Sequence, residues 1–253
     1  MFTPFEELDA LLADFTRSVR DILGDTFVGA YVQGSFALRA GDMHSDCDFV
    51  VATTVLPSGS AEAELRRLHD EIPTRRGFWT KHLEGSYANT TSLRSIDGIG
   101  VRWLFCDHGH RELLWDTHCN SPHTRWILRN HGITLAGPPI TDLVDEVPTQ
   151  AMRAALPEVL PGIKTWAPFD MAWTQRYIVS TYCRVLFTLH TGQVASKRGA
   201  LEWACENLDP GWRPLFIQVI ADRTRGWDPA DPPRPGSLEA TYAFAAYAQS
   251  FAD

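Results

Sequence analysis

Two aspartates separated by one residue open a stretch rich in β-branched and aromatic residues. Asp46 and Asp48 stand at the start of a predicted strand that covers residues 47–54. Because residues two apart on a strand point to the same face, both carboxylates should converge on one place. Two close carboxylates repel each other unless a cation neutralises them. Mg²⁺ suits such a pair, since it binds one or two carboxylates and completes its shell with water and phosphate oxygens.

A Gly-Ser pair precedes the aspartates by about ten residues and ends an earlier predicted strand, residues 26–33. Gly34 would let backbone N–H groups approach a phosphate closely, and the Ser35 hydroxyl would add a donor. Ser45 and Arg39 are further candidate contacts. Alone, a Gly-Ser is usually a turn and an Asp-x-Asp a solvated pair. Their combination on two successive strands predicts a triphosphate cradle beside a metal site.

The elements that must position these residues follow from the spacing of apolar residues. Strands are predicted over 26–33, 47–54, 77–87 and 100–106, and helices over 5–23, 60–70, 124–131, 149–160, 171–190, 196–207, 215–221 and 238–251. After about residue 108, strand-like runs give way to helical patterns. We therefore expect an α+β first half and an all-helical second half.

Composition and charge limit the classes of function. The 253 residues carry a net charge of −8, which argues against a nucleic-acid partner because such a partner favours an excess of Lys and Arg. No apolar stretch approaches the ~20 residues that span a bilayer, so no membrane association is expected. The N-terminus lacks the basic start and apolar run of a secretion signal. The missing signal pattern and the five scattered cysteines together predict a cytoplasmic protein with reduced thiols.

The stretch 32–51, VQGSFALRAGDMHSDCDFVV, resembles the signature of the DNA polymerase β-like nucleotidyltransferase superfamily. A second stretch, 176–208, resembles the aminoglycoside adenylyltransferases of the streptomycin–spectinomycin type: it has a helix carrying Arg, then Thr-Gly, then Ser-Lys, then a helix with Glu-Trp-Ala. The resemblance implies a small mixed-sheet nucleotidyltransferase domain over 1–148 and a helical C-terminal domain over 149–253. It also implies Mg²⁺-dependent transfer of AMP from ATP to a hydroxyl of a small aminoglycoside-like acceptor, with release of pyrophosphate and a role in antibiotic resistance.

Further site residues follow from the resemblance by position. Glu84 matches the third carboxylate of the superfamily, which acts as general base or assists the metals together with Asp46 and Asp48. Arg184 and Lys197 match the pair that binds the triphosphate. A solvent-facing Glu84, an inter-helix ion pair of Arg184 and a simply exposed Lys197 are the alternatives.

On the acceptor side, the family holds its cationic drug with carboxylates at the start of the Arg-bearing helix and with an aromatic residue. Asp170 matches the first carboxylate, and Trp103 lies about where the aromatic falls. Thr174 stands where a second carboxylate is expected, which leaves the identity of the acceptor open. Asp170 has an equally good alternative as an ordinary N-cap.

Other chemistries find less support. Cys106, His108 and His110, with His118 and Cys119 nearby, fit none of the usual zinc spacings. The sequence contains no Walker loop or G-x-G-x-x-G motif. Two alternatives to the adenylyltransferase hypothesis remain: a nucleotidyltransferase that modifies a protein or another metabolite, and a non-catalytic nucleotide-binding regulatory module of the same fold.

Overall fold

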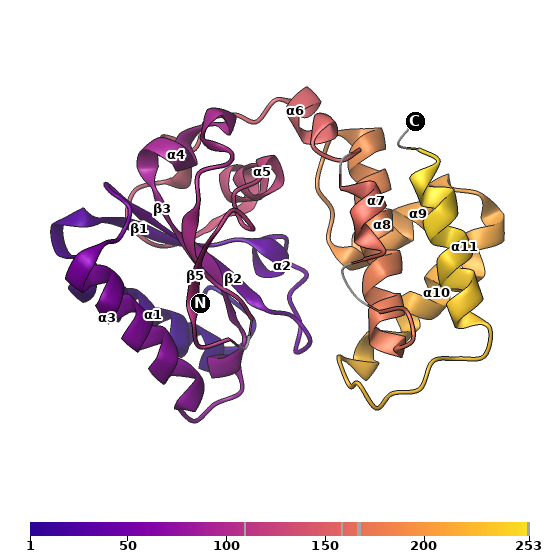
Figure 1. Ribbon diagram of the computed structural model, residues 1–253, viewed down its shortest axis with the longest axis horizontal. Helices are drawn as coiled ribbons and strands as arrows, with labels where there is room; N and C mark the ends of the chain where they lie inside the picture. Colours follow the sequence, from indigo (N-terminus) through magenta and orange to yellow (C-terminus); the bar gives the residue numbers. More distant parts are fainter. Residues whose placement is uncertain (109, 158, 166–167, 252–253) are drawn as a thin grey trace. The chain divides into compact units, whose positions relative to one another are not determined.

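The computed structural model describes residues 1–108, 110–157, 159–165 and 168–251 (Figure 1). It divides into two compact units, residues 1–147 and residues 148–253. The first contains a mixed sheet with helices, and the second is built from helices. This arrangement confirms the expected α+β fold with a helical second half.

A six-stranded sheet forms the centre of the first unit, in the order β5-β4-β3-β2-β1-β6. The strands are β1 (Phe27–Val32), β2 (Cys47–Thr53), β3 (Leu83–Asn89), β4 (Trp103–Cys106), β5 (Leu113–Asp116) and β6 (Ile133–Ala136). The central pair β2 and β3 is parallel, and the other neighbouring strands are antiparallel. A parallel pair needs a long connection between its strands, which here contains a helix between residues 53 and 83.

Helices cover both faces of this sheet (Figure 1). They are α1 (Glu6–Leu23), α2 (Gly34–Ala37), α3 (Gly59–Glu71), α4 (Thr90–Arg94) and α5 (Pro122–His131). Because side chains alternate along a strand, β2 sends Phe49 and Val51 into the core shared with α1 and α3, and Val50 into the core shared with α4 and α5. Asp48 and Asp46 are two and four residues before Val50, so they lie on the same face of the sheet as Val50.

Sequence patterns located most of these elements within a few residues, with two kinds of error. The strands β5 and β6 were not predicted, because each has only four residues and lies at an edge of the sheet, where a strand buries little of its surface. The predicted strand 77–87 was too long. Its first part forms a 3-10 turn at Trp79–Lys81, and pairing starts only at Leu83.

The second unit is assembled around one long helix. Its helices are α6 (Thr149–Ala154), α7 (Leu160–Ile163), α8 (Ala172–Thr191), α9 (Lys197–Asn207), α10 (Arg213–Ala221) and α11 (Ser237–Gln249). Ile178, Tyr182 and Leu186 of α8 are fully buried in the core of this unit. Gly192 ends α8 in the left-handed conformation.

One helix prediction in this unit was wrong in its extent. The run 149–160, of which residue 158 lies outside the described residues, is not a single helix, because α6 ends at Ala154 and α7 begins only at Leu160. Pro157 lies between them, and a proline inside a helix removes a backbone hydrogen bond and clashes with the preceding turn. No helix within the described residues has the length and apolar character needed to cross a membrane.

Candidate active site

The parallel register of β2 and β3 brings two of the expected carboxylates side by side. Asp48 pairs with Glu84 in this register, and Cys47 pairs with Leu83. Neighbouring strands lie about 4.8 Å apart, and paired residues point to the same face of the sheet. The Glu84 side chain is 17% exposed. Asp46 immediately precedes β2, so all three carboxylates lie at the end of the sheet where β2 and β3 begin.

The Gly-Ser pair lies directly against this end of the sheet. Gly34 begins α2 with a φ of 64°, and a Cβ placed on it would lie 1.9 Å from Oδ2 of Asp48. The backbone N–H of Gln33 donates to the carbonyl of Asp48 at 2.9 Å, which holds the loop against β2. The Ser35 Oγ is buried and has no hydrogen-bond partner among the described residues. An unpartnered hydroxyl beside carboxylates is a group that a bound phosphate could satisfy.

The donor set suits Mg²⁺. Asp46, Asp48 and Glu84 all offer carboxylate oxygens, which this hard cation prefers, and Gly34 leaves room for the Asp48 carboxylate.

Ser45 has a different environment from Ser35. It is buried, and its Oγ accepts from the N–H of Asp42 at 3.0 Å within a tight turn. Ser45 therefore shapes the loop that leads into Asp46.

Two histidines that the sequence did not link to the aspartates lie at this same end. Nδ1 of His108 is 2.8 Å from Oδ1 of Asp46, and Nδ1 of His82 is 3.8 Å from the same oxygen. The nearby Asp46 carboxylate raises the pKa of His108 above its usual value. His82 precedes β3 and His108 follows β4, so their sequence spacing gave no signal.

A third histidine lies beside Glu84. Nε2 of His118 is 3.7 Å from Oε1 of Glu84, and the imidazole packs on the ring of Phe105 with a centroid distance of 5.0 Å. The His118 side chain is 64% exposed. Its backbone N–H donates to Asp116 at 2.7 Å, which fixes the turn after β5. The unpredicted strand β5 is therefore what brings His118 to Glu84.

Arg184 and Lys197 lie on two packed helices of the second unit, α8 and α9. Lys197 is the first residue of α9, and Ser196 caps this helix by accepting from the N–H of Gly199 at 3.0 Å. The Nζ of Lys197 lies 5.2 Å from the ring centroid of Tyr177 and 5.1 Å from that of Trp227. In such cation–π contacts the ammonium group is attracted to the faces of the aromatic rings.

The start of α8 contradicts one of the two sequence interpretations of Asp170. The N-cap of α8 is Met171, so the alternative that Asp170 caps the helix was wrong, and Asp170 is exposed. Thr174 is fully buried, and its hydroxyl donates to the carbonyls of Pro168 and, at 2.8 Å, Met171. Thr174 therefore stabilises the start of α8, at the position where the family pattern has a second carboxylate that faces a ligand.

The prediction that Trp103 contacts the acceptor needs correction. Trp103 is 0% exposed, and its Nε1 donates to Oγ of Ser92 at 2.9 Å. The guanidinium of Arg125 lies 5.3 Å from the ring centroid. Trp103 is therefore a core residue of β4 and has no surface to offer a ligand.

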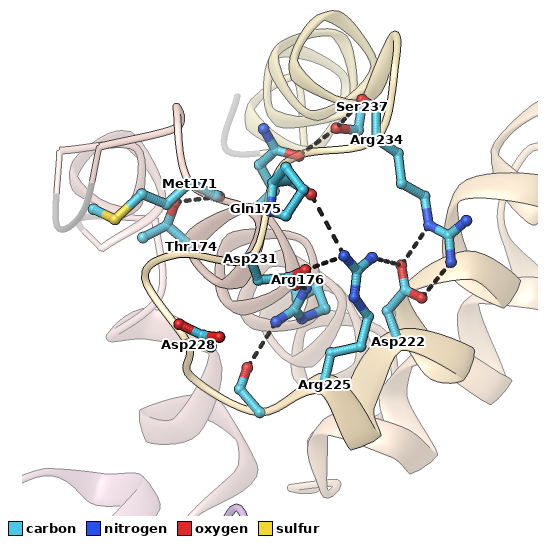
Figure 2. Close-up of polar contacts among 12 residues, drawn as sticks. Met171, Thr174, Gln175, Arg176, Asp222, Arg225, Asp228, Asp231, Arg234 and Ser237 are labelled. Carbon is cyan, nitrogen blue, oxygen red and sulfur yellow. Dashed lines mark hydrogen bonds and ion pairs between the residues drawn. The ribbon is translucent and has the colours of Figure 1, made fainter.

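An ionic network fixes the segment that carries Trp227 (Figure 2). Arg176 of α8 contacts Asp231 at 3.0 Å and donates to the carbonyl of Gly226 at 2.7 Å. Arg225 bridges Asp231 and Asp222. Arg234 binds Asp222 through two hydrogen bonds, and these lower the pKa of the Asp222 carboxyl. Because both ends of the segment are anchored, Trp227 is held near Lys197.

Comparisons with known proteins agree with this architecture. Residues 142–239 match the family model "Aminoglycoside adenylyltransferase, C-terminal domain". An aminoglycoside (3'') (9) adenylyltransferase of Klebsiella pneumoniae is 35% identical over 92 residues, which cover 36% of this chain and 34% of the relative. The chain therefore matches about a third of the length of that relative. A spectinomycin 9-adenylyltransferase of Campylobacter jejuni is 25% identical over 207 residues, 77% of each chain.

The fold comparison extends over almost the whole chain. The spectinomycin adenyltransferase AAD(9) from Enterococcus faecialis, solved with ATP and spectinomycin, superposes with a TM-score of 0.73 at 13% identity and covers 97% of this chain and 98% of that one. The mixed sheet followed by a unit of helices is therefore the fold of that adenyltransferase. The chain is therefore similar to aminoglycoside and spectinomycin adenylyltransferases, and its residues 142–239 match the C-terminal domain of the first of these.

Proposed function

We propose that the protein is a Mg²⁺-dependent adenylyltransferase, which transfers AMP from ATP to a hydroxyl of a small aminoglycoside-like acceptor and releases pyrophosphate. The observation that carries the proposal is the pairing of Asp48 with Glu84 in register, with Gly34 packed against Asp48. This arrangement gathers carboxylates for a metal and a base beside a loop that a triphosphate can approach. The similarity to aminoglycoside and spectinomycin adenylyltransferases supports the same reaction.

Asp46 and Asp48 would hold the metal, which, when bound, neutralises charge on the triphosphate and aligns the pyrophosphate leaving group. Gly34 keeps the backbone close to the phosphates, and the Ser35 hydroxyl donates to a phosphate oxygen. Ser45 contributes by fixing the turn that precedes Asp46. In this scheme the loop and the strand β2 act together, because the Gln33–Asp48 hydrogen bond joins them.

Glu84 would accept the proton of the acceptor hydroxyl as that oxygen attacks the α-phosphorus. The new O–P bond forms while the bond from the α-phosphorus to the bridging oxygen breaks, and pyrophosphate leaves. Glu84 is suited to this role because it is only partly exposed and lies beside Asp48 in the sheet. A base in this position is expected to contribute roughly 10²–10⁴-fold to the rate.

Arg184 and Lys197 would bind the triphosphate from the helical unit. Lys197 is the first residue of α9, and the N-terminus of a helix favours anions. The rings of Tyr177 and Trp227 contact the ammonium group and help to position it. Arg184, with its planar guanidinium, can bind two phosphate oxygens at once.

Asp170 would contact the cationic acceptor, as the exposed carboxylate at the start of α8. With Thr174 buried, this end of the helix offers one acid where the family pattern has two. Spectinomycin is the first acceptor to test, because a relative that matches 77% of the chain is named for it. Streptomycin and other aminoglycosides complete the panel.

The test is incubation of the purified protein with ATP, Mg²⁺ and each acceptor. The expected result is release of pyrophosphate with at least one acceptor, whose mass increases by one adenylyl group. The Asp48→Asn variant should lose turnover and metal-dependent ATP binding. If ATP binds but no panel member is modified, the acceptor assignment is wrong. If neither ATP nor another nucleoside triphosphate binds in the presence of Mg²⁺, the proposal as a whole is wrong.

A further inference from the structure

Asp46 takes part in a second cluster that the proposed reaction does not use. One carboxylate oxygen of Asp46 and one ring nitrogen each of His82 and His108 lie within 4.8 Å of one another. The three residues come from the starts of β2 and β3 and the end of β4. The order of strands in the sheet places these segments side by side.

The chemistry of this cluster differs from that of the carboxylate set. Two imidazole nitrogens and one carboxylate oxygen are ligands for Zn²⁺ and other divalent transition metals, whereas Mg²⁺ prefers oxygen ligands. We propose that Asp46, His82 and His108 form a binding site for a divalent transition metal such as Zn²⁺. Three protein ligands leave one position of a tetrahedral ion for water or another ligand.

The present distances are compatible with such an ion after small side-chain rotations. Ligands about 2.0–2.1 Å from a tetrahedral Zn²⁺ lie about 3.3 Å from one another. Oδ1 of Asp46 is 2.8 Å from Nδ1 of His108 and 3.8 Å from Nδ1 of His82, which brackets that value. The His82 and His108 rings are neighbours, with a centroid distance of 4.8 Å.

The cluster is both held in place and open to entry. The carbonyl of His82 accepts from the N–H of Cys47 at 2.7 Å, and its ring stacks on Phe78 with a centroid distance of 4.4 Å. The side chains of Asp46, His82 and His108 are 30%, 23% and 38% exposed. A partly exposed cluster on an ordered backbone lets an ion enter without rearrangement of the sheet.

This site and the proposed Mg²⁺ site share Asp46 and differ in their other ligands. Zn²⁺ binding needs His82 and His108 and does not need Asp48, whereas the proposed magnesium–ATP binding needs Asp48 and does not need the histidines. The Asp48→Asn variant therefore separates the two. A failure of the proposed function leaves the Zn²⁺ site intact, and a failure of the Zn²⁺ site leaves the adenylyl transfer intact.

The experiment titrates the EDTA-treated and desalted full-length protein with ZnCl₂ by calorimetry in a non-chelating buffer, without nucleotide. One equivalent should bind to the wild type and to Asp48→Asn. His82→Ala and His108→Ala should each weaken binding at least 10-fold. His110→Ala is the matched control: His110 is 64% exposed, pairs with Asp107 and lies outside the cluster, so this variant should bind as the wild type does.

A second readout is the visible spectrum with CoCl₂, whose d–d bands report the coordination of the ion. His82→Gln and His108→Gln repeat the test with side chains of more similar size, and circular dichroism confirms that each variant is folded. Unchanged Zn²⁺ affinity in both histidine variants would overturn the proposal. Loss of Zn²⁺ binding in Asp48→Asn would also overturn it, because the ion would then lie between the two aspartates.

Discussion

Gly34 and Asp48 are in such close contact that a Cβ on Gly34 would lie 1.9 Å from Oδ2 of Asp48. The φ of 64° at Gly34 also lies in the left-handed region, which costs an L-residue about 1–2 kcal/mol. The backbone at Gly34 in the loop and the carboxylate of Asp48 on the strand are therefore packed directly against each other. The proposed triphosphate loop cannot change at this position without moving a proposed metal ligand.

We expect Gly34→Ala to lower the affinity for magnesium–ATP at least 10-fold, because the new methyl group displaces the Asp48 carboxylate. Gly24→Ala is the matched control: Gly24 has a φ of 51°, and a Cβ there meets nothing within 4 Å. Both variants carry backbone strain, but only Gly34→Ala touches the carboxylate. ATP binding in the presence of Mg²⁺, measured by calorimetry, compares the two. Equal affinities would contradict the proposed role of this contact.

Glu84→Gln should separate ATP binding from transfer. Glutamine keeps the shape of the side chain but cannot accept the proton of the acceptor hydroxyl, so turnover should fall by roughly 10²–10⁴-fold. ATP binding should change little. Single-turnover pyrophosphate release and equilibrium ATP binding are the two measurements. Weakened ATP binding would instead identify Glu84 as a ligand of the metal.

The features found from sequence are those with a strong local pattern. Asp46 and Asp48 stand out because residues two apart on a strand share a face, and α8 stands out because its apolar residues recur at helical spacing. Each signal lies within a few residues of the feature that it predicts.

The features that were missed depend on strand pairing, which no local pattern encodes. His82, His108 and His118 are brought to the carboxylates by β3, β4 and β5, and spacing along the chain says nothing of these pairings. Trp103 was misassigned for a related reason. An aromatic residue in a strand predicts burial on one face, but only the finished sheet decides which face is covered.

Lys197→Ala should raise the KM for ATP about 10-fold or more, because the ammonium group would no longer meet the triphosphate. The adjacent Arg198→Ala is the control, since Arg198 is 74% exposed and pairs with Glu202 on the surface of α9. Removal of Arg198 should leave the KM for ATP within about twofold. Steady-state kinetics at saturating acceptor gives both values. A similar effect of both substitutions would indicate a general loss of positive charge.

The stability of the protein should fall as the pH decreases below about 6.5, in part because of His69. This residue is 2% exposed, its Nε2 lies 2.8 Å from the Tyr87 hydroxyl, and burial lowers its pKa from 6.5 to about 4. Because the unfolded chain binds a proton at His69 that the folded chain excludes, this contribution is fully present above pH 6.5 and is lost as the pH falls towards 4. The loss between pH 7.5 and pH 4.5 amounts to about 2–3 kcal/mol.

His69→Gln tests this directly, because glutamine can bond to the Tyr87 hydroxyl and does not titrate. Urea unfolding of wild type and variant should show a free-energy difference that shrinks by about 2–3 kcal/mol between pH 7.5 and pH 4.5. His110→Gln, at a side chain that is 64% exposed, should follow the wild type at every pH. A difference between His69→Gln and wild type that stays constant with pH would mean that His69 does not resist protonation in the folded state.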